Sequence, residues 1–319
     1  MSFVLYGILL IAGFFFLVKG ADLFVDGSSS VAKILKIPSV IIGLTIVSIG
    51  TSLPEAAVSV TASLSGSYDL SIANVIGSNI FNSLVVVGVS ALICPFAIDR
   101  MIMKRDFPIC TGLTVLLAFM LRDNTLSRFE AIILLVLFVS YILLLVFSAL
   151  KNKQDADEEY NVLPMWKSVL FILLGAAGII AGGQLTVESA KFFAKSFGMS
   201  EMLIGLTVVA IGTSLPELVT SIVAAKKGES EIALGNVVGS NIFNILFILG
   251  LSGTVHPLGC EPAALIDTIV LIGIFVTIGL VCLTGKKANR TEGAVCVVMY
   301  IVYVAYTIMR AYNILPAIF

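Results

Sequence analysis

Two acidic residues stand in the middle of long apolar runs, and each has the same six-residue setting. Glu55 ends the segment Gly-Thr-Ser-Leu-Pro-Glu, and Glu217 ends an unchanged second copy. The proline in each copy lacks an N–H donor and disrupts the preceding helical turn, which leaves backbone carbonyls in need of a partner. Carbonyl and carboxylate oxygens are the ligands that hard cations such as Na⁺ and Ca²⁺ take. The two segments therefore predict a cation site built on two broken helices.

A second pair of polar segments can complete such a site. Gly-Ser-Asn-Ile-Phe-Asn occupies residues 77–82 and recurs at residues 239–244. A spacing of four places the Ser and the last Asn of each copy on one helix face. Their hydroxyl and amide oxygens suit a hard cation, and the lack of nearby His or Cys argues against zinc, copper or iron. The two glutamates bring two negative charges, which would neutralise one Ca²⁺ or two Na⁺.

Other roles for these residues need to be weighed. Pro, Gly and Ser also occur in membrane helices as packing contacts. A charged residue at the bilayer centre costs about 2.5–3.5 kcal/mol, so a duplicated Glu there indicates function. An intramembrane hydrolase could use Glu55 and Glu217 as an acid/base pair, but an acid and a base need different surroundings and these two have identical ones. The chain is therefore predicted not to be an enzyme.

The composition predicts an all-α integral membrane protein. Of 319 residues, 59% are hydrophobic and 12% charged, and the mean hydropathy is +1.09. Soluble domains have about 45–50% apolar and about 25% charged residues. Apolar runs of about 20 residues can cross a bilayer as helices. Ten such spans are predicted near residues 3–33, 39–64, 70–95, 107–121, 128–149, 165–195, 201–225, 231–252, 264–284 and 291–311.

The two halves of the chain are copies of each other. Placing Glu55 on Glu217 without gaps, which we call the repeat alignment, superposes residues 43–55 on 205–217 with 11 of 13 identities, and residues 74–82 on 236–244 with one difference. Five spans in each half is an odd number, so the second copy must be inverted in the membrane. The predicted domains are a first five-helix repeat at 1–149, a linker at 150–164 and an inverted five-helix repeat at 165–319, with the second and seventh helices broken.

Charge distribution predicts the orientation and excludes some partners. Thirteen Lys and Arg residues fall in loops on the side of the linker, against five on the side of the termini. Because cytoplasmic loops are rich in these residues, the linker is placed in the cytoplasm and both termini outside a cell membrane. A net charge of −1 with no basic cluster gives no sign of nucleic-acid binding. The five cysteines show no paired spacing, and no cofactor and no obligatory protein partner is expected, only ions and membrane lipid.

The paired segments resemble the two α-repeats of the cation/Ca²⁺ exchanger superfamily, in particular its prokaryotic sodium/calcium exchanger branch. This resemblance implies ten helices in two inverted five-helix repeats around central sites that hold one Ca²⁺ or several Na⁺. It also implies an antiporter that extrudes Ca²⁺ in exchange for Na⁺ by alternating access around a midplane site. Coupling to H⁺ or K⁺, or a cation channel, are the alternatives that the residues leave open.

The resemblance also assigns roles to individual residues. Those that match the family's calcium-site carboxylates and its carbonyl ligands are Glu55, Glu217, Thr51, Thr213, Ser48 and Ala210. Those that match its sodium-site hydroxyls and its midplane amides are Ser52, Ser214, Ser78, Ser240, Asn82 and Asn244. This chain has Asn244 where well-described members of the family carry Asp. The amide is nearly isosteric with a protonated acid, so the difference bears on proton dependence and ion stoichiometry.

Overall fold

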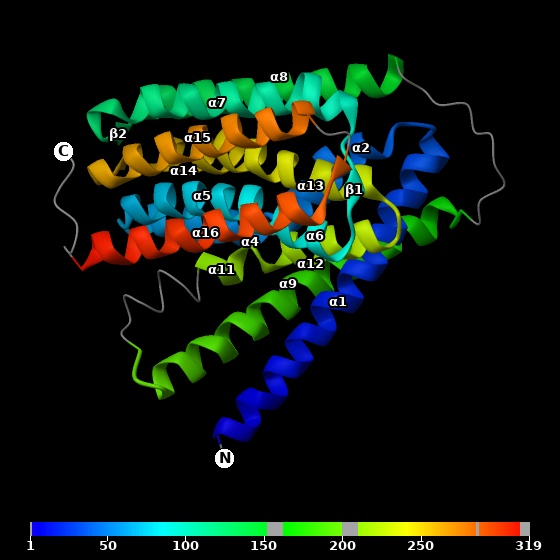
Figure 1. Ribbon diagram of the computed structural model, residues 1–319, viewed down its shortest axis with the longest axis horizontal. Coiled ribbons are helices and arrows are strands. Elements are labelled where there is room, and N and C mark those ends of the chain that lie inside the picture. Colours follow the sequence, from blue (N-terminus) through cyan, green and yellow to red (C-terminus); the bar gives the residue numbers. More distant parts are fainter. Residues whose placement is uncertain (1, 152–161, 200–209, 285–286, 313–319) are drawn as a thin grey trace.

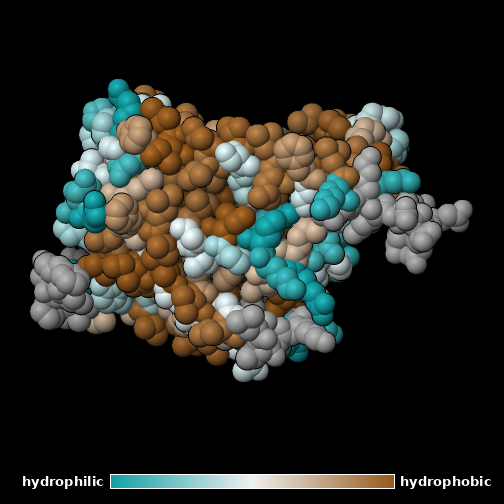
Figure 2. Space-filling model, turned by 90° about the horizontal axis from the view of Figure 1, so that it is seen from above, coloured by the Kyte–Doolittle hydropathy of each residue, from teal (hydrophilic) through white to brown (hydrophobic). Residues whose placement is uncertain are grey.

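The computed structural model describes residues 2–151, 162–199, 210–284 and 287–312, and it is built almost entirely of helices (Figure 1). Within those residues, seven helices are long and apolar enough to cross a membrane, or eight if one bent pair is counted as a span. Figure 2 shows hydrophilic residues at the two ends of the helices and a largely apolar surface between them. The all-helical fold is thus confirmed, and the chain is a multi-pass membrane protein.

The helices of the first half are α1 (Ser2–Leu35), α2 (Ser39–Ile42), α3 (Ser48–Thr51), α4 (Leu53–Leu64), α5 (Tyr68–Phe81), α6 (Val87–Ile93), α7 (Phe107–Met120) and α8 (Arg128–Lys151). Those of the second half are α9 (Met165–Ser196), α11 (Ala210–Thr213), α12 (Leu215–Lys226), α13 (Ser230–Phe243), α14 (Gly250–Val255), α15 (Pro262–Thr284) and α16 (Arg290–Ala311). Wider π-helical turns join some of them, at η1 (Gly43–Val47), η2 (Asn82–Val86), η3 (Ile102–Asp106) and η6 (Asn244–Leu249), and a 3₁₀ turn, η4 (Leu121–Asp123), follows α7.

Most predicted spans agree with these helices to within a few residues, but two need comment. The fourth predicted span begins at residue 107, which places Lys104 and Arg105 among the loop residues on the linker's side; instead, η3 continues α7 toward the N-terminus and includes both. The charges are tolerated because Arg105 forms an ion pair of 3.0 Å with the fully buried Asp106, which also accepts a 3.0 Å hydrogen bond from the Tyr141 hydroxyl. Residues 201–209 of the predicted seventh span lie outside the described residues.

Two minimal strand pairs tie the halves of the chain together. Strand β1 (Phe96–Ala97) pairs with β4 (Lys287–Ala288), and β2 (Thr125–Leu126) pairs with β3 (Leu258–Gly259), both antiparallel. The repeat alignment places β1 on β3 and β2 on β4. It therefore turns one strand pair into the other, register included.

Helices α1 and α9 form an oblique pair on one side of the bundle (Figure 1). Their backbones approach so closely that a Cβ on Gly20 would lie 2.8 Å from the Gly175 carbonyl oxygen, and one on Gly13 would lie 3.0 Å from that of Gly182. Because the contact moves toward the start of α9 as α1 proceeds, the two helices are antiparallel. Glycine is required along this seam by close approach.

Candidate functional site

Each of the two helix breaks places an acid on the first turn after it. Ser52 separates α3 from α4 with φ −86° and ψ 8°, and Ser214 separates α11 from α12 with φ −92° and ψ 6°. The first break bends the helix by 49°. Glu55 and Glu217 lie in the first turns of α4 and α12, and both side chains are fully buried. A proline near the start of each helix fits a position that has no intrahelical N–H bond to lose.

The two breaks lie against each other and exchange hydrogen bonds. The Ser52 hydroxyl donates to Glu217 Oε1 at 2.7 Å, and the Ser214 hydroxyl donates to Glu55 Oε1 at 3.0 Å. Each acid is thus held by the serine that lies three residues before the other acid. The second carboxylate oxygen of each acid, Oε2, is buried and has no hydrogen-bond partner among the described residues.

Asparagine amides from the two halves form a second cross-linked group. Asn82 Nδ2 donates to Asn241 Oδ1 at 3.3 Å, and Asn244 Nδ2 donates to Asn79 Oδ1 at 3.0 Å. These bonds leave Oδ1 of Asn82 and of Asn244 buried and without a partner in the described part of the chain. Both residues begin a π-helical turn, η2 or η6, a feature frequent at functional sites.

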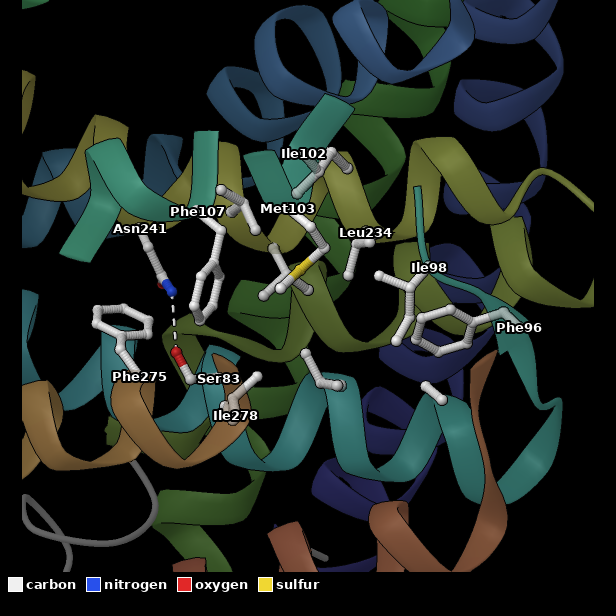
Figure 3. Close-up of a pocket in the computed structure, with 14 residues that line it drawn as sticks. Ser83, Phe96, Ile98, Ile102, Met103, Phe107, Leu234, Asn241, Phe275 and Ile278 are labelled. Carbon is white, nitrogen blue, oxygen red and sulfur yellow. Dashed lines mark hydrogen bonds between the residues drawn. The ribbon is translucent and has the colours of Figure 1, made fainter. Parts of the chain in front are cut away.

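Figure 3 shows Asn241, one member of this group, from an adjoining pocket, where its amide donates to the Ser83 hydroxyl at 3.0 Å. The remaining walls of that pocket are mostly apolar, among them Met103, Phe107 and Phe275. Apolar side chains therefore shield the amide group on this side.

The other predicted ligands lie in the same region. Ser240 donates to the Ser48 carbonyl oxygen at 3.5 Å, and the Ser78 hydroxyl is buried without a partner among the described residues. The Thr51 hydroxyl donates to Asn236 Oδ1 at 3.0 Å and also lies within hydrogen-bond distance of the Val47 and Ser48 carbonyl oxygens. Thr213 is 7% exposed and occupies the equivalent place in α11. The backbone of Ala210 begins α11.

Four asparagines that the sequence analysis left without a role support these residues. Asn74 donates to the Glu55 carbonyl oxygen at 3.3 Å and to Ser59 at 2.9 Å. Asn236 donates to the Glu217 carbonyl oxygen at 3.4 Å and to Ser221 at 3.0 Å. Asn79 and Asn241 hold the two amides described above. All four lie within the segments 74–82 and 236–244 that the two halves share, and this repetition is the sequence signal that could have identified them.

The electrostatics of the site favour a bound cation. Neither Glu55 nor Glu217 is paired with a Lys or Arg in the described residues. Buried charges without a partner are strongly destabilising, and buried acceptors without donors add to that cost. The described residues hold no group of three or more His, Cys, Asp and Glu residues, the type of cluster that binds transition metals. Carboxylate, amide and hydroxyl oxygens suit Na⁺ or Ca²⁺.

Comparison with known proteins agrees with this chemistry. The family described as "Sodium/calcium exchanger protein" matches the chain twice, at residues 5–147 and 167–309. The protein CaxA of Alkalimonas amylolytica, named as a putative antiporter, is 41% identical over 93% of this chain and 96% of its own length. The sodium/calcium exchanger MaX1 of Methanosarcina acetivorans is 35% identical over 93% of this chain and 96% of its own length.

A solved structure shows the same fold. The sodium-calcium exchanger NCX_Mj, soaked with Na⁺ and Sr²⁺, superposes with a TM-score of 0.84 at 31% identity, covering 95% of this chain and 98% of that one. The family match spans most of the chain, and the two full-length relatives are more than 30% identical to it. The chain therefore belongs to the sodium/calcium exchanger family.

Proposed function

We propose that this chain is a sodium/calcium antiporter that extrudes Ca²⁺ in exchange for Na⁺. The observation that carries the proposal is the set of buried acceptor oxygens left open at the centre: Oε2 of Glu55 and Glu217, and Oδ1 of Asn82 and Asn244. Oxygens of this kind, contributed by both halves of the chain, suit a hard cation.

Each residue of the site has a distinct part in the proposal. Glu55 and Glu217 supply the two charges that one Ca²⁺ or two Na⁺ would neutralise. The amides of Asn82 and Asn244 add neutral oxygens at the midplane. The remaining ligands are hydroxyls and backbone carbonyls from Thr51, Thr213, Ser52, Ser214, Ser78, Ser240, Ser48 and Ala210. Because both ion types need the same two carboxylates, they compete, and competition is the basis of exchange.

We further propose that the site is reached alternately from the two sides of the membrane by two inverted five-helix repeats, ten helices in all. The two family matches, at residues 5–147 and 167–309, coincide end to end under the repeat alignment. The antiparallel α1 and α9 meet through glycines, as at Gly20 and Gly175, so their backbones lie close together along the pair. Such a contact is compatible with sliding of this pair across the bundle.

The bounds of the proposed repeats are those predicted from the sequence. Residues 1–149 and 165–319 form the two repeats, and the linker 150–164 joins them on the cytoplasmic side, with residues 152–161 outside the described part of the chain. The end of α8 and the start of α9 lie at the opposite end of the bundle from the C-terminal end of α16 (Figure 1). This supports a linker and a C-terminal end of α16 on opposite sides, and the excess of Lys and Arg on the linker's side is the reason for proposing that the termini lie outside the cell.

Transport in vesicles tests the function. Vesicles that contain the purified protein and are loaded with Na⁺ should take up labelled Ca²⁺ when diluted into Na⁺-free medium, and Glu55→Gln should lower the uptake about 100-fold. Replacing the Na⁺ gradient by an H⁺ or K⁺ gradient separates the alternative driving ions. Absence of uptake on Na⁺ dilution, or full activity of Glu55→Gln, would refute the proposal. Currents far faster than exchange would indicate a channel instead.

A further inference from the structure

One face of α4 carries the polar character of the site beyond Glu55. Ser59 and Ser63 follow Glu55 at intervals of four residues, so the three side chains lie on one face of the helix. Ser59 is fully buried and Ser63 is 3% exposed. A buried polar stripe therefore continues for two turns away from the site, toward the end of α4 that leads into α5.

A second polar stripe on α5 faces the first. Ser78, Asn74 and Ser71 are separated by four and three residues, and so share one helix face. The 2.9 Å hydrogen bond from Asn74 to Ser59 fixes how these two helices are aligned. Because the chain reverses direction between α4 and α5, Ser71 lies level with Ser63, one turn farther from the site.

Helix α14 closes the third side. The Ser63 hydroxyl donates to the Ser252 carbonyl oxygen at 2.8 Å. We call the group formed by these residues the serine seam: Ser59, Ser63, Ser71, Asn74 and Ser252.

Two hydroxyls of the serine seam lack partners although they are fully buried. Ser71 Oγ and Ser252 Oγ belong to residues that are 0% exposed, and they have no hydrogen bond to any described residue. A serine in a membrane helix ordinarily bonds to the carbonyl one turn back. Leaving a buried hydroxyl unpaired costs about 1–3 kcal/mol, so a small polar occupant is favoured beside them.

The second half of the chain provides a built-in comparison. Under the repeat alignment, Ser63 becomes Ala225 and Ser71 becomes Ala233. Ser221, the counterpart of Ser59, donates to the Ala233 carbonyl oxygen at 3.4 Å. Ser90, the counterpart of Ser252, is also buried without a partner among the described residues, but the counterparts of Ser63 and Ser71 are alanines that carry no hydroxyl. Only the first half therefore carries the extra hydroxyls of Ser63 and Ser71 on the helix faces that continue from the site, so any role of these hydroxyls is confined to one side.

We propose that the serine seam is a hydrated passage by which water and Na⁺ reach Glu55 from the end of the molecule that carries strands β2 and β3. The inference rests on the proposed sodium/calcium exchange and adds a route between α4, α5 and α14, apart from the α1 and α9 pair. The outer end of the passage lies where Tyr68, at the start of α5, stacks on His256, just after α14, with ring centroids 4.2 Å apart.

Reactivity of single cysteines tests the passage without any transport. The five native cysteines are replaced by Ala, and Ser71→Cys and its counterpart Ala233→Cys are each reconstituted in lipid nanodiscs, where both faces meet solvent. Ag⁺, a thiol-reactive cation close to Na⁺ in size, should react with Ser71→Cys at least about tenfold faster than with Ala233→Cys, because the first position is hydrated. Ser63→Cys against Ala225→Cys repeats the comparison if Ser71→Cys does not fold. Equal, slow reaction at both positions would overturn the proposal.

Transport by swapped variants links the passage to Na⁺. The double variant Ser63→Ala/Ser71→Ala gives the first half the residues of the second, while Ala225→Ser/Ala233→Ser is the matched control. The first should raise the half-saturating Na⁺ concentration about fivefold, near the value of one lost hydrogen bond, and leave that of Ca²⁺ unchanged. Unchanged Na⁺ dependence would overturn the proposal. If the unmodified protein shows no Na⁺-driven Ca²⁺ uptake, the proposed function fails, whereas the Ag⁺ result still decides whether the seam is hydrated.

Discussion

The two halves of the chain resemble each other more closely at the centre of the bundle than at its periphery. At the centre, the halves keep the same residue types and make reciprocal contacts, as when Ser52 donates to Glu217 and Ser214 to Glu55. At the periphery, the halves perform the same task with different residues. The contrast separates positions that must face a shared ligand from positions that only have to hold helices together.

The ties between the last two helices of each half illustrate the periphery. In the first half, Arg105 on η3 donates to Ser148 on α8 at 2.6 Å and pairs with its neighbour Asp106. Under the repeat alignment, Arg105 becomes Asp267 and Ser148 becomes Arg310, and these two form a bidentate ion pair of 2.9 and 2.7 Å between α15 and α16. The arginine thus lies on the other helix of the pair, while the contact keeps its position in the repeat. Any complementary pair suffices there, whereas a cation between the halves requires oxygens from both.

The largest expected effect comes from the two acids. Glu55→Gln and Glu217→Gln should each lower Na⁺-driven Ca²⁺ uptake about 100-fold. Each variant removes one of the two carboxylates that pair with the buried cation, and losing one partner of a buried charge pair costs roughly 3 kcal/mol. Initial rates of labelled Ca²⁺ uptake in vesicles measure this. Ser65→Ala, in the exposed turn after α4, is a control that should retain full activity. Residual rates that differ more than about tenfold between the two acids would break the equivalence of the halves at the centre.

The peripheral ties should affect stability rather than ion binding. Asp106→Ala removes the fully buried carboxylate that Arg105 and Tyr141 contact, and should lower the free energy of unfolding by about 3 kcal/mol. Asp267→Ala should cost less, because the Asp267 side chain is 14% and its partner Arg310 26% exposed. Thermal unfolding in detergent gives the order of the two losses. A changed half-saturating Ca²⁺ concentration in folded Asp106→Ala would argue against a purely structural tie.

Much of the centre was predictable from the sequence. A Glu in an apolar run is expensive, and its repetition after the same proline and hydroxyls indicated the broken helices that the structure describes around Ser52 and Ser214. The mutual hydrogen bonds of the serines and acids could not be predicted. They depend on how two segments from opposite halves of the chain meet, and local spacing does not encode such a contact.

The periphery was predictable only in part. Lys104 and Arg105 were expected in a loop, because the apolar run begins at residue 107. Tertiary contacts from α8 overrode that pattern, since Tyr141 and Ser148 satisfy the charged groups. The hydrogen bonds by which Asn74 and Asn236 support the site could likewise not be predicted, although the sequence shows the same residue at this position in both halves.

A smaller effect is expected from the crossed hydroxyls. Ser52→Ala and Ser214→Ala each remove one donor to the opposite acid, which is worth about 1–1.5 kcal/mol. Each should raise the half-saturating Na⁺ concentration about five- to tenfold, since both serines are also proposed Na⁺ ligands. Competition between Na⁺ and labelled Ca²⁺ measures this shift. A large change in only one of the two variants would show that the crossed contacts are not equivalent.

The smallest effect is expected from Asn244→Asp at low pH. A protonated carboxyl can donate to Asn79 Oδ1 as the amide does at 3.0 Å, so exchange should stay within about twofold of the unmodified protein. As the pH rises the carboxyl ionises and loses that bond, and the Na⁺ and Ca²⁺ dependence of the variant should diverge from that of the unmodified chain. Exchange measured across a pH series checks both the low-pH and the high-pH behaviour. A variant with the same pH profile as the unmodified chain would contradict the assigned role of the Asn79 contact.

The position of a bound divalent cation tests the central claim most directly. A crystal of the protein soaked with Sr²⁺, located by its anomalous scattering, should show one main site within coordination distance of both Glu55 Oε2 and Glu217 Oε2. The same site should lose Sr²⁺ as Na⁺ is raised. A main Sr²⁺ site elsewhere, such as the acidic surface pocket lined by Asp99, Glu229 and Glu231, with none between the two glutamates, would contradict the account.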